Sequence, residues 1–150
     1  MSLDRYMSLL RAYARQHGGV QGDFAEEMEL ELEVQRQRIR LKFVPADADP
    51  DEAHLLARID VAQLSDVPSA TVSRMLLQAN ACWAGIHGGA LGLRCSDVVM
   101  LSVSQRIASL DVEGLAALLQ SMAQDARRWK ACLNVTVPAL QLQPALEVLV

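Results

Sequence analysis

The stretch EMELELEVQRQRIRLKF, residues 27–43, alternates charged and apolar residues along most of its length. Its first half has a glutamate at every second position, and its second half has an arginine or lysine at every second position. Because successive side chains of a β-strand point to opposite faces, each half predicts a strand with one wet face and one buried face. The two halves almost adjoin, which predicts an antiparallel hairpin.

The same pattern predicts how the two strands pair. If Val34 lies opposite Gln37, glutamates of the first strand face cations of the second, and apolar residues face apolar residues. A slip of one residue would bury every charge, whereas a shift of two preserves both patterns. The wet face is therefore better determined than the register. The predicted pairs are Glu33–Arg38, Glu31–Arg40, Glu29–Lys42, Leu32–Ile39, Leu30–Leu41 and Met28–Phe43.

Helices and further strands surround this hairpin. Apolar residues at three- and four-residue spacing predict amphipathic helices, and short apolar runs between turn residues predict strands. The predicted helices are 3–17, about 68–83, and one that starts near Ser109 or Asp111 and runs to 133; the further strands are 54–64, 89–95 and 97–107.

This order predicts an α+β domain in which an antiparallel five-stranded sheet is combined with three helices, α-β-β-β-α-β-β-α. We expect the domain to span residues 1–133. An apolar C-terminal tail at 134–150, with two prolines and one charged residue, is expected to follow it.

Composition narrows the function classes. The chain has 150 residues, 51% of them hydrophobic, which suits one globular domain. Its net charge is −4 and it has no basic block, so we expect no nucleic-acid partner. The N-terminus does not resemble a signal peptide, and we expect no membrane insertion. Three cysteines without a CxxC pair are typical of reduced thiols in a cytosolic protein.

The middle helix has too much apolar surface for one sheet to cover. Residues 75–93, MLLQANACWAGIHGGALGL, contain no Asp, Glu, Lys or Arg. A helix that is apolar most of the way round is buried most of the way round. We therefore predict a homodimer paired about a two-fold axis through this helix; coverage by the first helix or the tail within one subunit is the alternative. The predicted interface residues are Val72, Met75, Leu76, Ala79 and Trp83.

No motif predicts catalysis, a cofactor or a metal. The glycines at 85–92 do not form GxGxxG. Cys82, His87 and Cys95 are the best metal constellation, but without paired spacing they fit buried cysteines and a turn histidine better. The glutamates of the hairpin face cations, which lower a carboxyl pKa, whereas a general acid needs a raised one. We expect a binding protein, not an enzyme, with no metal and no cofactor.

Three segments resemble the cytosolic chaperones of bacterial type III secretion, the Tir-chaperone (CesT-like, class I) family. In that family a helix ending in Ala-Asn leads through a glycine-rich turn into two strands and a long helix that ends in aromatic and basic residues. Ala79-Asn80, Gly88-Gly89 and Arg128-Trp129 match those points. The segments are YMSLLRAYARQHG (6–18), LSDVPSATVSRMLLQANACWAGIHGGALGL (64–93) and LDVEGLAALLQSMAQDARRW (110–129), within a resemblance over about 2–132.

The resemblance implies a small acidic homodimer in the bacterial cytoplasm. Such chaperones bind the N-terminal segment of one or more secreted effectors in extended form, keep it soluble and competent for secretion, and deliver it to the secretion ATPase. They catalyse no reaction. The competing interpretation is a regulatory interaction protein on the same fold that sequesters another cytosolic partner.

We expect the effector segment to dock in an apolar groove and to pair with an edge strand. A tyrosine suits such a groove, because its ring is apolar while its hydroxyl stays wet. The alternative is that most of these residues form ordinary core between the first helix and the sheet. The predicted effector-binding residues are Leu3, Tyr6, Leu10, Tyr13, Leu30, Leu41 and Phe43.

Overall fold

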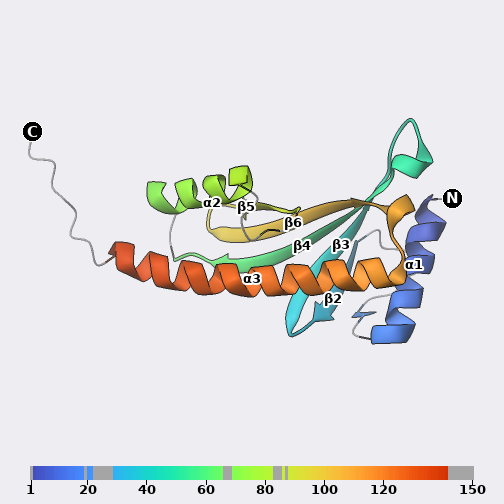
Figure 1. Cartoon of the computed structure of the whole chain (residues 1–150), viewed down its shortest axis with the longest axis horizontal. Helices are drawn as coiled ribbons and strands as arrows, with labels where there is room; N and C mark the ends of the chain where they lie inside the picture. Colours follow the sequence, from blue (N-terminus) through green and yellow to red (C-terminus); the bar gives the residue numbers. More distant parts are fainter. Residues whose placement is uncertain are drawn as a thin grey trace, which may run out of the picture.

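A computed structural model of the chain describes residues 2–18, 20–21, 29–65, 69–82, 86 and 88–141. Within them the predicted α+β class is confirmed: three α-helices accompany an antiparallel sheet in the predicted order. The sheet has six strands in the order β1-β2-β3-β4-β6-β5, because a two-residue strand, β1, adds to the five predicted (Figure 1).

The elements have the following bounds. The helices are α1 (Ser2–His17), α2 (Ala70–Cys82) and α3 (Val112–Gln141), with short 3-10 helices η1 (Pro50–Glu52) and η2 (Ile107–Ser109). The strands are β1 (Val20–Gln21), β2 (Glu29–Val34), β3 (Gln37–Val44), β4 (His54–Gln63), β5 (Ala90–Arg94) and β6 (Val98–Arg106).

The hairpin has the predicted register. Val34 pairs with Gln37, and the pairs continue in step to Glu29 and Lys42; Met28 lies outside the described residues. The turn residues Gln35 and Arg36 have φ of 51° and 64°, the left-handed conformation of a two-residue type I′ turn. This turn has the right-handed twist of the strands that it joins, so it fixes the register that the alternation alone left open.

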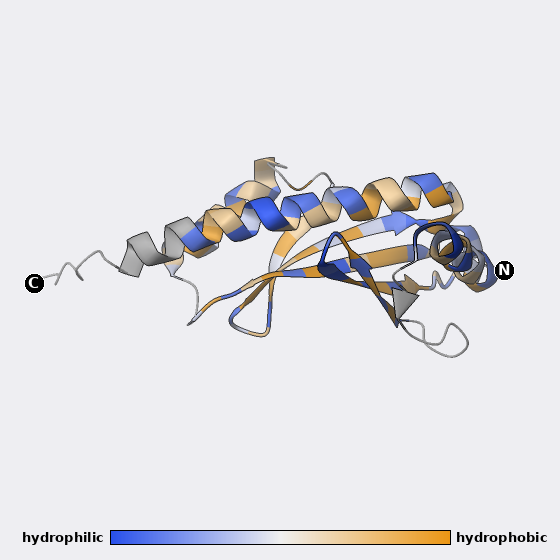
Figure 2. Cartoon of the chain, turned by 90° about the horizontal axis from the view of Figure 1, so that it is seen from below, coloured by the Kyte–Doolittle hydropathy of each residue, from blue (hydrophilic) through white to orange (hydrophobic). Residues whose placement is uncertain are grey.

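In the part of the chain that the structure describes, helices cover only one face of the sheet. In β2, β3 and β4, buried apolar residues alternate with residues that are exposed or half-buried. The long helix α3 lies along the covered face, and α1 and α2 both contact α3, near opposite ends of it (Figures 1 and 2). The largest fully buried side chains of this layer are Tyr6, Leu10, Leu32, Ile39, Leu41, Leu55, Ile59, Ile86, Leu101, Ile107, Leu115 and Leu119.

The uncovered face carries the charges. The Asp60 carboxylate accepts hydrogen bonds from Arg40 at 2.8 Å and from Arg94 at 2.7 Å, so it joins β3, β4 and β5. The predicted charged ladder of the hairpin lies on this face, where Arg38 approaches Glu31 to 3.7 Å. These ion pairs are solvent-exposed and contribute little stability each, but they keep this face wet.

Side chains cap the starts of two helices. The described part of α2 begins at Ala70, where the Ser69 hydroxyl accepts a hydrogen bond from the Val72 N–H at 3.3 Å. Residues 66–68, where we predicted the start, lie outside the described residues. Asp111 caps α3 by accepting from the Gly114 N–H at 2.7 Å, as one of the two predicted starts requires.

The third helix does not stop at Leu133 but continues to Gln141. The beginning of the segment that we expected as a separate tail is therefore helical. Residues 142–150, the remainder of that tail, lie outside the described residues.

The hairpin turn generates a stability prediction. We expect Arg36→Gly to raise the free energy of unfolding by about 0.5–1 kcal/mol, because glycine adopts positive φ without the strain that a Cβ introduces. Arg38→Gly, two residues along in strand β3, is the control and should lower it, since glycine weakens a strand. Urea unfolding at one protein concentration measures both. An equal loss in the two variants would contradict the turn assignment.

The Tyr6 hydroxyl is an unusual buried group. The side chain is 0% exposed, its ring centroid lies 5.5 Å from that of Phe43, and among the described residues the hydroxyl has no hydrogen-bond partner. Burial raises the pKa of this hydroxyl above its ordinary value of 10.0, and the negative charge of Glu29 raises it further. The folded protein therefore holds the proton more tightly than the unfolded chain does.

Tyr6→Phe should change stability in a pH-dependent way. Near neutral pH, loss of an unpaired buried hydroxyl should raise the free energy of unfolding by about 1 kcal/mol. Above pH 10 the tyrosine of the unfolded parent ionises, and the parent should lose about 1.4 kcal/mol per pH unit that the variant keeps. Urea unfolding at pH 8 and pH 11 tests this. A stability difference that is the same at both pH values would contradict the buried, protonated hydroxyl.

Candidate functional site

The first candidate surface is formed by α1 and the strands beside it. Tyr6, Leu10 and Tyr13 of α1 are buried, as are Leu30, Leu41 and Phe43 of β2 and β3. Leu3, one turn before Tyr6, is 41% exposed. Six of the seven predicted effector-binding residues thus meet in the core of a single chain, in the arrangement that we had named as the alternative, and Leu3 alone of the seven reaches the surface.

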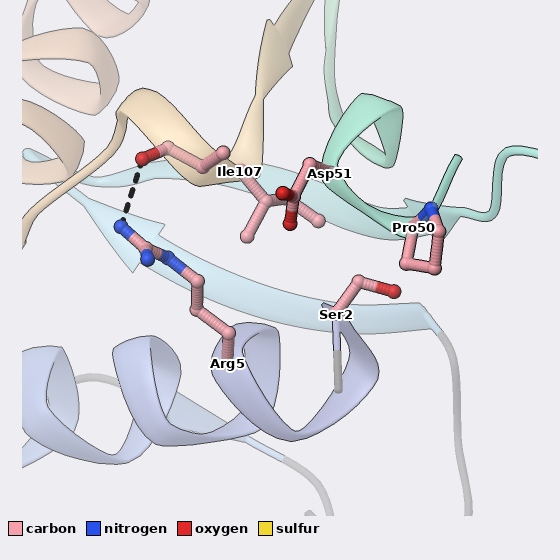
Figure 3. Close-up of a pocket in the computed structure, with 6 residues that line it drawn as sticks. Ser2, Arg5, Pro50, Asp51 and Ile107 are labelled. Carbon is pink, nitrogen blue, oxygen red and sulfur yellow. Dashed lines mark hydrogen bonds between the residues drawn. The ribbon is translucent and has the colours of Figure 1, made fainter.

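The start of α1 is tied to the turn before α3. The Arg5 guanidinium donates a hydrogen bond to the Ala108 carbonyl of η2 at 2.8 Å (Figure 3). Beside this bond lies a hollow of about 230 Å³ lined by residues of α1, η1 and η2: Ser2, Arg5, Pro50, Asp51, Ile107 and Ala108. Its charged groups are one guanidinium and one carboxylate, and the Arg5 hydrogen bond holds the start of α1 against η2.

A second hollow, of about 370 Å³, lies where β6 leads through η2 into α3. Leu110 and Leu118 supply its apolar wall. Its remaining lining residues are Gln105, Ser109, Gly114 and Ser121. None of the six residues that line this second hollow is charged.

The second candidate surface is formed by α2 and β5. Of the predicted interface residues, Val72, Leu76 and Ala79 are buried within the chain, and Met75 is half-buried against the same core. Trp83 lies outside the described residues. The four described residues of the predicted interface thus contact the core of their own chain.

The outer side of α2 carries a different apolar residue. Leu77 is 68% exposed, and Ala81, four residues later on the same side, is exposed as well. Leu93 of the neighbouring strand β5 is 40% exposed. Leu77 and Leu93 are two of the four large apolar residues that are exposed in the described part of the chain; Leu3 and Val44 are the others.

The pKa shifts of Arg94 and Tyr13 arise from contacts that hold the fold together. The hydrogen bond and charge of Asp60 raise the pKa of Arg94, and burial raises that of Tyr13. Within the described ranges, no three His, Cys, Asp or Glu residues cluster as metal ligands. Cys82 and Cys95 are exposed rather than buried, and His87 lies outside the described residues. No helix in the described ranges is long and apolar enough to cross a membrane.

Three solved complexes contain a chain with the same fold as this one. The ExsC–ExsE complex matches with a TM-score of 0.69 at 20% identity over 87% of this chain and 95% of the other. The HopA1–SchA chaperone–effector complex matches with a TM-score of 0.66 at 20% identity over 87% and 97%. The ExoU–SpcU complex of the Pseudomonas aeruginosa type III secretion system matches with a TM-score of 0.62 at 17% identity over 83% and 98%.

At these identities the structures share the fold of this chain, and a search of curated proteins found no match. A comparison with protein families gives the assignment. The Tir chaperone protein (CesT) family matches residues 23–130, a range that begins just before β2 and ends within α3. It includes α2, both strands of the β2–β3 hairpin, and strands β5 and β6. This match covers most of the chain, and the chain therefore belongs to the Tir chaperone protein (CesT) family.

Proposed function

We propose that the chain is a type III secretion chaperone that binds the N-terminal segment of one or more effectors in extended form. In the bacterial cytoplasm it keeps that segment soluble and competent for secretion, and it presents the complex to the secretion ATPase. The observation that carries this proposal is the family match over residues 23–130. It favours the chaperone over a regulatory protein that sequesters another partner.

The effector segment is proposed to bind at the end of the molecule formed by α1 and β2. Leu3 supports this, since it is an exposed apolar residue on a helix whose other apolar residues are buried or half-buried. The buried residues of the predicted set, Tyr6 and Phe43 among them, then hold α1 against the sheet and shape the groove wall. Edge-strand pairing adds backbone hydrogen bonds that do not depend on the effector's sequence.

Homodimer formation is the second part of the proposal. We assign the interface to the outer side of α2 and to β5, with Leu77, Ala81 and Leu93 as contact residues. Their exposure supports this, because exposed apolar side chains that gather on neighbouring elements are typical of interaction surfaces. The opposite side of α2 packs on the core through Val72, Leu76 and Ala79, which keeps the proposed interface residues facing outward.

Co-purification tests the function itself. In a bacterium with a type III secretion system, the tagged chain should co-purify with an effector, and deletion of its gene should lower secretion of that effector. An effector that is secreted equally well without the chain would contradict the proposal. The mapped N-terminal segment of that effector is then the ligand for affinity measurements.

Leu3→Asp should weaken the effector complex about fivefold, since one shallow apolar contact among several contributes on the order of 1 kcal/mol. Leu3 is exposed, so the free chain should unfold at the same temperature. Ser8→Asp, which adds the same charge at another exposed position of α1, is the control and should bind normally. Calorimetric titration with the mapped segment measures this. Equal affinities for both variants would exclude Leu3 from the groove.

Leu77→Glu should convert the dimer into a folded monomer. The side chain is 68% exposed in the single chain, so a charge there should leave the fold of each subunit intact. Gln78→Glu, the neighbouring exposed residue, is the matched control and should remain a dimer. Light scattering gives the mass, and circular dichroism checks the fold. A monomeric parent, or a Leu77→Glu dimer of unchanged affinity, would refute this interface.

A further inference from the structure

The outer edge of β5 is the feature that the proposed function leaves unexplained. β5 is the last strand of the sheet, and an edge strand presents backbone N–H and C=O groups that can pair with another chain. In an antiparallel strand, every second residue directs these groups to the same side. We can therefore identify the residues of β5 whose backbone N–H and C=O groups point away from β6, and ask which of these groups are hydrogen-bonded.

Asn80 of α2 occupies the outward position at Leu91. Its side-chain Nδ2 donates a hydrogen bond to the Leu91 carbonyl at 2.8 Å, and the Leu91 N–H donates one to the Asn80 Oδ1 at 2.7 Å. A carboxamide has the same donor and acceptor as a peptide group. Asn80 thus makes the pair of bonds that a residue of a neighbouring strand would make.

The period of two gives Gly89 and Leu93 as the other outward positions. The Gly89 N–H donates to the Ile86 carbonyl at 2.6 Å, within the turn that leads into β5. On the described β5, Leu93 is the one outward position whose backbone groups have no partner. One free position is too short to hold an added strand.

We propose that Asn80 is an edge-closing residue: its carboxamide takes the place of a strand beside Leu91, so that β5 accepts no added strand. The opposite edge does accept one, since β1 pairs there with Leu32 and Glu31 of β2. If the proposed effector binding is right, an extended effector strand is thereby directed to the β1–β2 edge. Two subunits accordingly pair through side chains at α2 and β5 and form no continuous sheet across β5.

Amide hydrogen exchange of the parent chain, followed residue by residue by NMR, tests the closure without any effector. The Leu91 amide should exchange at least about tenfold more slowly than the Leu93 amide, because only the first is hydrogen-bonded. Equal protection of both amides would mean that another strand is paired on β5, and an unprotected Leu91 would mean that the Asn80 bonds do not form. Either result overturns the proposal.

Asn80→Leu separates hydrogen bonding from packing, since leucine fills a similar volume but makes neither bond. The Leu91 amide should then exchange about tenfold faster, and in sedimentation experiments the variant should associate through the opened edge into species larger than the parent. Adding Gly92→Lys should remove this association, because a Cβ at Gly92 meets no atom within 4 Å and lysine discourages edge pairing. Gln78→Ala, on the same helix, is the control and should behave as the parent.

Two outcomes with Asn80→Leu would overturn the proposal. Unchanged protection of Leu91 would show that packing, not the carboxamide, covers the edge. Faster exchange without additional association would show that the Asn80–Leu91 hydrogen bonds form but do not prevent another strand from pairing with β5. Because no effector is present, these results are independent of whether the chain is a secretion chaperone.

Discussion

The structure depends on burying one face of the sheet and leaving the other face exposed to solvent. Alternating residues in β2, β3 and β4 give an apolar face and a charged face, and all three helices belong to the layer on the apolar side. A one-residue slip in any strand would exchange the two faces. The type I′ turn at Gln35 and Arg36, and the carboxylate of Asp60 between two arginines, both support this arrangement.

One-sided burial also underlies our proposal of where partners bind. The charged face is exposed to solvent and helices cover the apolar face, and we assign partners to the ends of the helical layer and to the edges of the sheet. The two edges differ: β1 extends the sheet beside β2, whereas Asn80 caps β5. We therefore propose that the fold separates a surface for an extended partner from a surface for a second copy of the chain.

The sequence predicted the fold well because its signals are local. Glutamates and arginines at every second position determined the hairpin and its pairs, and apolar residues at helical spacing located α1 and α2 to within a few residues. The end of α3 was harder to predict. Two prolines and few charges after Leu133 indicated a separate tail, yet the helix continues to Gln141.

The surfaces were harder still, because core and groove residues have the same apolar character and helical spacing. Tyr6 and Leu10 share a stripe with Leu3, and only the packing of α1 shows which of them is exposed. On α2, the stripe through Val72 faces inward and Leu77 faces out. The Asn80 hydrogen bonds depend on a contact between α2 and β5 that the sequence does not show. The Ala79-Asn80 pair therefore indicated the family but not the role that we propose for Asn80 at the β5 edge.

Hydrogen–deuterium exchange of the chain with and without a bound N-terminal effector segment tests the central claim most directly. The account predicts new protection in α1 and β2, at the end of the sheet where strands can be added, and unchanged exchange in β5. New protection confined to α2 and β5, with α1 and β2 unaffected, would contradict the separation of the two surfaces.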